Sequence, residues 1–397
     1  MNKELKEKYL KQYKDELFTY CAPFWLKYGW DKENGGLLNC LDEKGQVYSS
    51  DKSVWLQGRC AWMYAYLSNN FGKNDEYLAF SKSCLDFLDN HCFDEDGRMY
   101  FLVTKDGKPL RKRRYFFSET FYVMAAAEYY KATGDARYLE KARKVYDLVW
   151  NIFIDPKLDP FKIFPKVYPE TRSTKAMACP MIILNINYIM REYDEERLSY
   201  YNDNAKKCIE EIKLHYNKEL HGMFENITAD NKFNLDVSTE RIINPGHDLE
   251  CAFFLAQEAK YANDKDLFDF AQIVFKDAIK RGWDNEFGGI KYFVDALGYP
   301  VEAYEHDMKL WWTHNEGINA SLFMYKQTKD EYYLDWFIKL TDYAFDHFSE
   351  HKYGEWYGYL RRDGHVTEPP CKGHTYKGPF HVMRCLATVI KLLESME

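Results

Sequence analysis

Hydrophobic positions along this chain recur with a period near 3.6 residues, which predicts long amphipathic helices through almost the whole sequence. The helices are of two kinds that alternate. One kind carries charges on its outer face, and these outer helices are predicted at 4–19, 73–90, 136–153, 195–215, 262–281 and 330–349. The other kind is more apolar and aromatic, and these inner helices are predicted at 53–67, 118–131, 175–191, 247–260, 313–326 and 379–394. The pattern indicates an all-α protein.

The helix pairs return at an interval of about 65 residues, which indicates one supersecondary unit present six times. The connections into the inner helices share a turn rich in Asp, Asn and Gly. Its clearest copies lie at 30–37, 93–100 and 283–290, with looser copies near 219–224 and 353–358. Such turns followed by Leu, Tyr and Phe predict short β-ribbons.

Six outer and six inner helices joined by ribbons predict an (α/α)6 barrel. No linker rich in Pro, Gly or Ser divides the chain, so residues 1–397 are expected to form a single domain. In such a barrel the inner helices run parallel, and their N-termini bring free N–H groups to one mouth. We therefore expect the functional site beneath the ribbons at that mouth. The alternative is an open α-solenoid that binds proteins, but six near-equal repeats favour the closed form.

Composition restricts the function further. A net charge of −8 argues against nucleic acid and anionic membranes as partners. The charged N-terminus lacks the apolar core of a secretory signal, and no apolar run is long enough to span a membrane. Ten scattered cysteines form no CxxC pair, so we expect a reduced, cytoplasmic protein. The basic run at 111–114 is interpreted as a ribbon tip or a solvated face.

Two histidines stand in matching settings. His247 and His381 each follow a Gly/Pro turn and lie on the first turn of a long apolar helix. Imidazole can both accept and donate a proton near neutral pH. Two such rings facing one cavity would suit a reaction that removes a proton on one side and returns it on the other. A single histidine in this place is more often a cap or a packed core residue, but two equivalent ones favour function.

The first turns of the inner helices supply the other candidates for the lining of the site. The residues chosen are Trp55, Arg59, Glu119, Met181, Asn185, Glu250, Trp312, His314 and Glu316, with His374 in the last ribbon ranked below His381. Arg59 could hold a substrate oxygen or could join helices through a buried ion pair. Trp311 and Trp312 cannot both face inward, so one of them is expected to be structural.

Other catalytic classes have little support in the sequence. His247 and Glu250 are too few ligands for a metal site, so no metal is predicted. The chain has no phosphate-binding loop, dinucleotide fingerprint or nucleophile elbow. We therefore expect no cofactor and no covalent serine chemistry.

Six stretches of this sequence resemble the N-acylglucosamine 2-epimerase family, and particularly its amino-sugar branch. They are 51–59, 116–122, 176–181, 244–250, 308–316 and 377–381. The resemblance runs from about residue 25 to residue 390 and implies the same (α/α)6 fold. It also implies interconversion of N-acetyl-D-glucosamine and N-acetyl-D-mannosamine, through removal of the C2 proton, an enediolate and reprotonation on the opposite face.

The resemblance also implies roles for individual residues. His247 and His381 match the two acid/base positions, and Arg59 matches a residue that stabilises the developing oxyanion. Glu250 and Glu316 match acidic partners that orient the histidines or assist ring opening. Family members are often homodimers, and some are modulated by ATP, although no nucleotide site can be assigned in this sequence.

Three other functions stay open at this stage. The first is aldose–ketose isomerisation of mannose, or 2-epimerisation of a disaccharide, because substrate pose cannot be read from sequence. The second is an inverting glycoside hydrolase, with a carboxyl pair drawn from Glu119, Glu250 and Glu316. That reading leaves the histidine pair without a role. The third is a toroid that binds sugar or protein without activity, which would leave costly buried charges unused.

Overall fold

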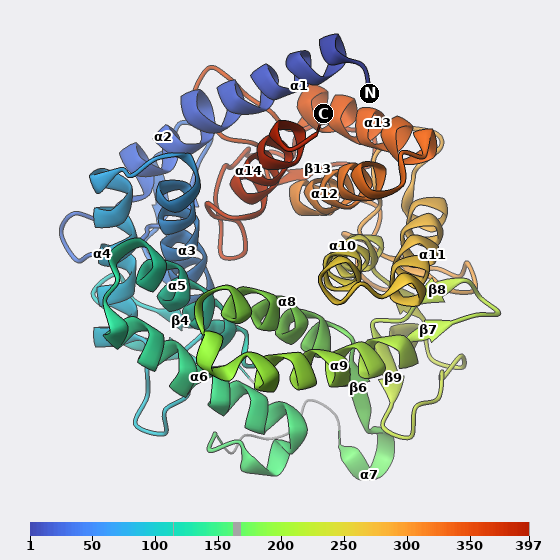
Figure 1. Cartoon of the computed structure of the whole chain (residues 1–397), viewed down its shortest axis with the longest axis horizontal. Helices are drawn as coiled ribbons and strands as arrows, with labels where there is room; N and C mark the ends of the chain where they lie inside the picture. Colours follow the sequence, from blue (N-terminus) through green and yellow to red (C-terminus); the bar gives the residue numbers. More distant parts are fainter. Residues whose placement is uncertain (114, 162–167, 397) are drawn as a thin grey trace.

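The computed structural model describes residues 1–113, 115–161 and 168–396. Within them, long helices form two concentric rings (Figure 1). The outer ring comprises α1 (Lys3–Asp15), α4 (Asp75–His91), α6 (Ala136–Ile154), α9 (Leu198–Leu214), α11 (Lys265–Gly282) and α13 (Glu331–His347). The inner ring comprises α3 (Val54–Phe71), α5 (Phe117–Thr133), α8 (Ala178–Tyr193), α10 (Pro245–Ala262), α12 (Trp311–Thr328) and α14 (His381–Glu394).

The inner ring is closed. Each inner helix contacts the next one in the chain, and α14 packs against α3, so the first and last repeats meet. One hydrophobic core contains buried residues from all twelve helices. The predicted inner helices begin within three residues of the observed ones, so the predicted (α/α)6 barrel is confirmed. None of the described helices combines the length and the apolar character that crossing a bilayer requires.

Polar caps explain where most of the outer helices begin. The side chains of Asn2, Asn74, Asp135, Asp264 and Asp330 each accept a hydrogen bond from a backbone N–H in the first turn of the helix that follows. The local sequence therefore acts together with the packing to fix where these helices begin.

The first outer helix is longer than predicted. It was expected to end at residue 19, but the helical backbone continues through a π-helical segment at Glu16–Cys21, a short α2 (Ala22–Phe24) and a second π-helical segment at Trp25–Gly29. Pro23 has no N–H to donate, so the regular α-helical ladder cannot pass through it unchanged.

Short strands lie in the connections that run from each outer helix to the next inner helix. The strands are β1 (Cys40–Leu41), β2 (Val47–Ser49), β3 (Lys52–Ser53), β4 (Leu102–Val103), β5 (Pro109–Arg111), β6 (Thr174–Ala176), β7 (Tyr216–Asn217), β8 (Gly222–Met223), β9 (Asn226–Thr228), β10 (Ile242–Ile243), β11 (Val294–Asp295), β12 (Lys309–Leu310) and β13 (Tyr359–Leu360). The remaining short helical segments of the described residues are α7 (Pro169–Arg172) and 3-10 turns at Pro156–Leu158, Glu195–Arg197 and Ser238–Glu240.

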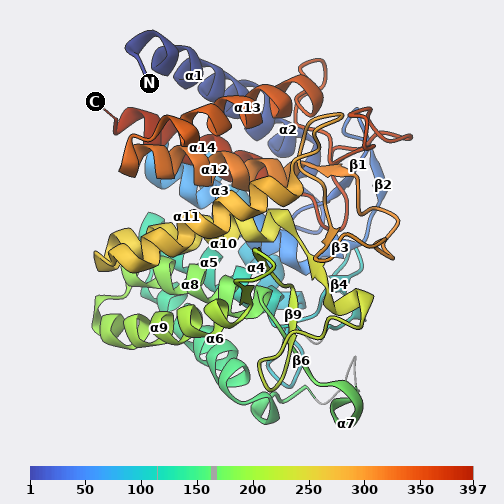
Figure 2. The same ribbon diagram turned by 90° about the vertical axis from the view of Figure 1, so that its right-hand side faces the viewer.

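The pairing of these strands follows one rule. The strand just before an inner helix pairs antiparallel with a strand of the next ribbon: β3 with β4, β6 with β9, β10 with β11, and β12 with β13. A bridge between Asp42 and Cys371 joins the last ribbon to the first. All the strands gather at one end of the barrel (Figure 2). The predicted ribbons therefore cover the mouth at which the inner helices begin.

The repeated turn owes its shape to a buried ion pair. In the copy at 30–37, Lys52 Nζ donates to Asp31 Oδ2 at 2.9 Å, and in the copy at 283–290, Lys309 Nζ donates to Asp284 Oδ2 at the same distance. All four side chains are almost fully buried. Each lysine precedes an inner helix by one or two residues, so the pair fixes the turn against the start of that helix.

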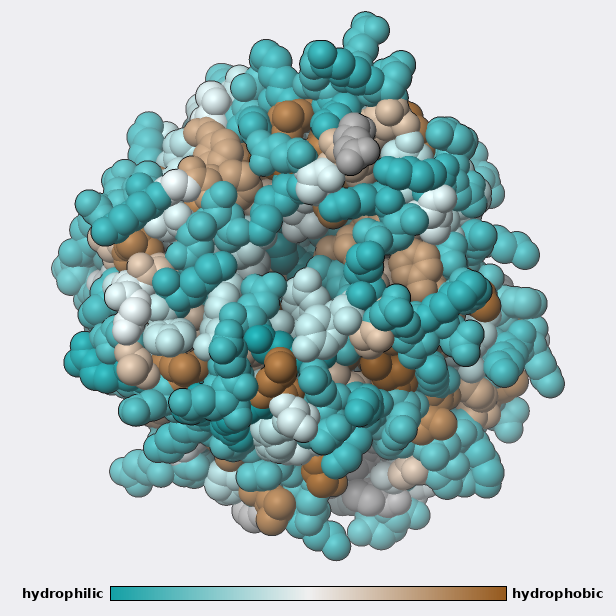
Figure 3. Space-filling view, viewed as in Figure 1, coloured by the Kyte–Doolittle hydropathy of each residue, from teal (hydrophilic) through white to brown (hydrophobic). Residues whose placement is uncertain are grey.

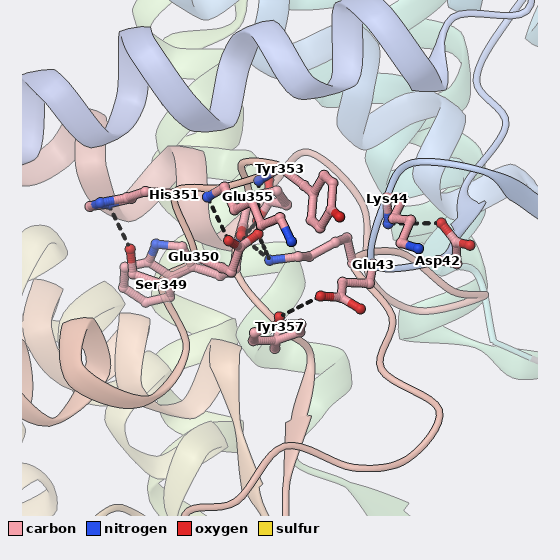
Figure 4. A network of polar contacts seen from close by, with 12 residues as sticks. Asp42, Glu43, Lys44, Ser349, Glu350, His351, Tyr353, Glu355 and Tyr357 are labelled. Atoms are coloured by element: carbon pink, nitrogen blue, oxygen red, sulfur yellow. Dashed lines mark hydrogen bonds and ion pairs between the residues drawn. The ribbon is translucent and has the colours of Figure 1, made fainter.

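A second buried network joins the two ends of the chain. Glu355 accepts hydrogen bonds from Trp25 Nε1 and from Lys377 Nζ, the latter at 2.9 Å. Glu16 accepts from Trp356 Nε1 at 2.7 Å and from Ser349 Oγ at 2.7 Å. Figure 4 shows Glu355 and Ser349 among the neighbouring polar residues of this region. The network anchors the last ribbon to the first outer helix.

The basic run was interpreted as a ribbon tip or a solvated face, but its described residues, 111–113, lie at and just after the end of the second strand of the hairpin, whose turn lies at 104–108. Arg111 ends β5 and is exposed. Lys112 is bound to Asp94 and Asp96 within the chain, and the guanidinium of Arg113 lies 3.9 Å from the ring centroid of Phe101. Arg114 lies outside the described residues.

Candidate active site

His247 is placed by the start of α10. The side chain of Asn244 accepts hydrogen bonds from the N–H groups of Gly246 and His247, at 3.0 and 3.2 Å, which caps the helix. Pro245 occupies the first position, where a missing N–H costs nothing. The local sequence thus fixes the backbone that carries the imidazole. The side chain of His247 is 26% exposed, so the ring stays accessible.

Glu225 is the partner of His247. Its Oε1 lies 2.7 Å from Nδ1 of His247, and a carboxylate can only accept, so Nδ1 carries the proton and Nε2 is left for a substrate. Burial lowers the pKa of His247, but the charge of Glu225, assisted by Glu250 and Glu316, outweighs burial and leaves the pKa above its usual value. This ring therefore holds a proton more readily than a free imidazole.

His381 has a matching partner but the opposite electrostatic setting. Its Nδ1 lies 2.8 Å from Glu316 Oε1, which again leaves Nε2 free of that contact. Burial and the positive charge of Arg59, then that of Arg384, hold the pKa of His381 well below its usual value. His381 is thus a neutral base where His247 is closer to an imidazolium, and the two rings are suited to complementary steps.

Trp312 contacts both imidazoles. Its ring centroid lies 5.0 Å from that of His247 and 5.8 Å from that of His381. Gly246 makes room for this arrangement, because a Cβ there would lie 2.5 Å from Cγ2 of Thr313 and 2.8 Å from Cη2 of Trp312. The structure therefore brings the two predicted histidines to one place, with an aromatic ring that touches each.

A buried arginine holds the two inner carboxylates together. Nη2 of Arg384 donates to Oε1 of Glu250 at 3.1 Å and also to Oε1 of Glu316. Oxygens of both carboxylates and a ring nitrogen of His381 lie within 4.8 Å of one another, a spacing that a metal ion could also use. Here the guanidinium already supplies the positive charge between them. The group is therefore explained by an ion-pair network around His381.

Arg59 is a cation without a carboxylate partner among the described residues. Its guanidinium carbon lies 4.1 Å from the ring centroid of Phe121 and 4.8 Å from that of Phe380, and its buried Nε makes no hydrogen bond in the described part of the chain. Burial lowers the pKa of Arg59 to about 9, against the pull of Glu250 and Glu316, which keeps it charged at neutral pH. Two aromatic faces thus hold a guanidinium whose donors remain available.

Three other predicted residues lie in the walls of the barrel. The partly exposed Trp55 packs against Phe101, with 5.2 Å between ring centroids. Met181 is buried in the core. Glu119 is fully buried, and its Oε1 accepts from Arg98 Nε at 2.7 Å and from the N–H of Met99 at 2.8 Å. Glu119 therefore binds the preceding ribbon and makes no described contact with the histidine pair.

His314 and His374 make no described contact with His247 or His381. The ring nitrogens of His314 both bond to backbone, Nδ1 to Leu310 O at 2.7 Å and Nε2 to the N–H of Ile290 at 2.9 Å. Its ring stacks on Tyr343 of the outer helix α13, so His314 faces outward. On an α-helix, residues two apart point in nearly opposite directions, so His314 cannot share the inward face of Glu316. His374 packs in the last ribbon, where its ring centroid lies 5.4 Å from that of Trp311.

Asn185 lies at a different depth. It lines a cavity of about 680 Å³ near the opposite mouth of the barrel, together with Arg384. The periodicity of α8 correctly predicts that Asn185 faces inward, but the residue lies two turns further along the helix than the histidines do along theirs.

Sequence reasoning missed Glu225. The loosely repeated turn at 219–224 ends one residue before it, and β8 and β9 flank it in the structure. An acidic residue directly after an apolar ribbon, within reach of the next inner helix, is the signal that could have found it. The contact of Arg384 with two carboxylates also could not be read from its spacing to His381.

The barrel brings two imidazoles, each held by a carboxylate, to one place, an arrangement suited to acid–base chemistry on a small substrate. Comparison with known proteins specifies the class. Residues 35–385 match the model of the N-acylglucosamine 2-epimerase (GlcNAc 2-epimerase) family. The N-acylglucosamine 2-epimerase of Bos taurus is 35% identical, and the alignment covers 99% of this chain and 94% of that protein.

More distant relatives share the fold. The cellobiose 2-epimerase of Dictyoglomus turgidum is 24% identical over 96% of this chain and 99% of that protein. The solved structure of cellobiose 2-epimerase from Bacillus thermoamylovorans superimposes with a TM-score of 0.84 at 20% identity, covering 97% of this chain and 99% of that one. The chain belongs to the N-acylglucosamine 2-epimerase family, and it is a carbohydrate epimerase, an isomerase.

Proposed function

We propose that this enzyme interconverts N-acetyl-D-glucosamine and N-acetyl-D-mannosamine by moving the proton at C2. The observation that supports this most directly is the pair of imidazoles at one place, each with Nδ1 held by a carboxylate. The identity of about 35% with N-acylglucosamine 2-epimerases, against 24% with cellobiose 2-epimerases, favours an amino-sugar substrate.

The proposed reaction begins with the open-chain sugar, whose C1 aldehyde makes the C2 proton acidic. Nε2 of one histidine removes this proton, and the electron pair moves toward C1 to give an enediolate-type intermediate with its charge on O1. The other histidine then donates a proton to C2 from the opposite face, which inverts this carbon. In the reverse direction the two histidines exchange roles, so each must act both as base and as acid.

The surrounding charges are suited to these steps. His381 is held neutral, as a base must be, while His247 retains its proton beside Glu225. Arg59 has free donors and no carboxylate partner in the described part of the chain, so we propose that it stabilises the charge on O1. Glu316 holds the tautomer of His381, and Glu250 shares Arg384 with it.

The other residues predicted to contact the substrate differ in their surroundings. Trp312 is proposed to form one wall of the substrate site, because it touches both imidazoles. Trp55, Met181 and His374 stay predicted substrate contacts. Glu119 is bonded to Arg98, and His314 is bonded to the backbone of Ile290. Any effect of these two residues on the substrate would therefore be indirect, through the position of the wall of the site.

The geometry argues against an inverting glycoside hydrolase. Such an enzyme keeps its two carboxyl groups about 6.5–9.5 Å apart to admit a water molecule. Glu250 and Glu316 have oxygens within 4.8 Å of each other, and one guanidinium binds both. Neither carboxylate is placed to act alone on a glycosidic bond.

We further propose that the enzyme works in the cytoplasm as a single domain. The ten cysteines of the described chain are all free, and most are buried, which suits a reducing compartment. A homodimer and modulation by ATP stay predictions from the family resemblance.

The test is to incubate the protein with N-acetylmannosamine in D2O and to follow C2 by NMR. Formation of N-acetylglucosamine carrying deuterium at C2 would support the proposal. Parallel incubations with mannose and with cellobiose serve as controls. Conversion of mannose to fructose or epimerisation of cellobiose, without exchange at C2 of the amino sugar, would refute the proposed substrate.

A further inference from the structure

The barrel contains a cavity at the mouth opposite to the ribbons. Its volume is about 680 Å³, within the usual range of small-molecule sites. It is lined by the C-terminal halves of the inner helices, with Asn70 of α3, Lys131 of α5, Gln257 of α10 and Lys391 of α14 among its residues. Figure 1 looks into this mouth, and Figure 3 shows a recess near its centre surrounded by hydrophilic residues. We call this cavity the rear recess.

The floor of the rear recess has an unused donor. Arg384 lines the recess, is 7% exposed, and its buried Nε finds no acceptor among the residues that the structure describes. Its Nη2 is occupied on the other side by Glu250 and Glu316. Asn185 lines the same floor at 8% exposure and makes no side-chain hydrogen bond within the described residues. Buried donors without partners are costly, so the floor is suited to a ligand oxygen.

The walls present aromatic rings from separate helices. Tyr66 of α3, Tyr188 of α8 and Phe323 of α12 line the recess and are each partly exposed. The face of an aromatic ring is negative, so it attracts the weakly positive C–H groups of a saturated ring. Rings on different sides of one recess would contact both faces of a bound ring compound.

The charges around the recess nearly cancel. Lys131 and Lys391 are offset by Glu192 and, in part, by Glu128, because burial raises the pKa of Glu128 to about 7. The charge of Arg384 is already balanced by its carboxylates. Glu128 itself accepts hydrogen bonds from Asn69 Nδ2 at 2.7 Å and from the Tyr193 hydroxyl at 2.9 Å. A site of balanced charge with aromatic walls and both donors and acceptors favours a neutral, hydroxyl-rich ligand over an ion.

We propose that the rear recess is a second binding site, which takes a neutral saccharide. It is separate from the histidine pair, because His247 and His381 do not line it and the layer formed by Arg384 and its two carboxylates lies between. The inference does not depend on which sugar the enzyme epimerises.

Chemical protection of an introduced thiol tests this proposal. Thr388 lines the recess and is partly exposed, so the thiol introduced by Thr388→Cys should react with iodoacetamide. N-acetyl-D-glucosamine is the probe, and mass spectrometry of the peptide gives the alkylation rate. Lys144→Cys, on the exposed face of the outer helix α6, is the matched control.

The proposal predicts saturable slowing of alkylation by the sugar, several-fold in Thr388→Cys and absent in Lys144→Cys. Adding Gln257→Trp, which fills the recess, should abolish the slowing while the double variant still epimerises its substrate. Equal rates with and without sugar would overturn the proposal. Slowing of alkylation that persists in the variant with Gln257→Trp would also overturn it, because the sugar would then be acting from the histidine site. Epimerase activity, measured in parallel, tests the proposed function independently.

Discussion

Glu225 Oε1 lies 2.7 Å from Nδ1 of His247, and the two residues belong to different elements, a ribbon and the inner helix α10. The second imidazole has the same arrangement, with Glu316 on α12 serving His381 on α14. The two carboxylates differ in one respect. Glu316 is also bound by Arg384, whereas Glu225 has no arginine or lysine partner among the described residues. The surroundings shift the two pKa values in opposite directions: burial, Arg59 and Arg384 lower that of His381, whereas the charge of Glu225 outweighs burial at His247.

The pH dependence of turnover should reflect this asymmetry. The reaction needs one neutral imidazole and one that carries a proton. Activity should fall at acid pH as His381 becomes protonated, well below the usual histidine range, and at alkaline pH as His247 loses its proton, above that range. We expect a bell-shaped profile of kcat/KM with a broad maximum near neutrality. A profile with a single rising limb would contradict the assignment.

Glu225→Gln should move only the alkaline limb. The amide still bonds to Nδ1 but removes the charge that raises the pKa of His247, so this limb should shift to lower pH. We also expect kcat to fall by about tenfold or more. Glu219→Gln, an exposed position of the same ribbon, is the control. A shift of the acid limb instead would show that Glu225 acts elsewhere.

Arg59→Lys should reduce kcat by about a hundredfold while changing KM less, because a developing charge is stabilised mainly in the transition state. Lysine keeps the charge but loses the planar group that stacks between Phe121 and Phe380. Arg197→Lys, where the guanidinium lies 4.7 Å from the ring centroid of Tyr200, is the control. An effect on KM alone would assign Arg59 to ground-state binding.

Arg384→Met should destabilise the fold by about 3–5 kcal/mol, because it removes the hydrogen-bonded counterion of the buried carboxylates Glu250 and Glu316. Urea unfolding at neutral pH measures this loss. Adding Glu250→Gln removes one of the two charges and should restore part of the stability. If Arg384→Met has the same free energy of unfolding as the wild type, the contacts of Arg384 with the two carboxylates do not stabilise the fold.

Glu128→Gln should change how stability depends on pH. Burial raises the pKa of Glu128 to about 7, so between about pH 4.5 and 7 the native state keeps a proton that the unfolded chain releases, and stability falls as pH rises through this range. The glutamine variant lacks that loss, and relative to wild type it should gain about 3 kcal/mol between pH 4.5 and pH 8. Urea unfolding at the two pH values checks this, with the exposed Glu140→Gln as the control. An unchanged pH dependence would refute the burial effect.

The sequence predicted the barrel well because its signals are local. Helix periodicity, capping residues and the repeated turn each act over a few residues, and the inner helices begin within three residues of their predicted positions. His247 and His381 were found for the same reason, since each follows its own Gly/Pro turn.

What the sequence could not predict depends on depth and on contacts between repeats. Asn185 faces inward as expected but lies in the rear recess, because periodicity gives the face of a helix and not the distance along the barrel. Glu225 reaches His247 across a ribbon, which no spacing within one helix reveals. His314 was grouped with Glu316, although residues two apart on a helix point in different directions.

The central claim is that two histidines act on opposite faces of C2. The most direct measurement compares His247→Ala and His381→Ala by NMR in D2O, starting from each pure epimer. Each variant should lose epimerisation by about 10²–10⁴-fold, yet each should still exchange the C2 proton of one epimer for deuterium without inverting it. The two variants should exchange different epimers. Near-wild-type epimerisation by either variant, or exchange of the same epimer by both, would contradict the account.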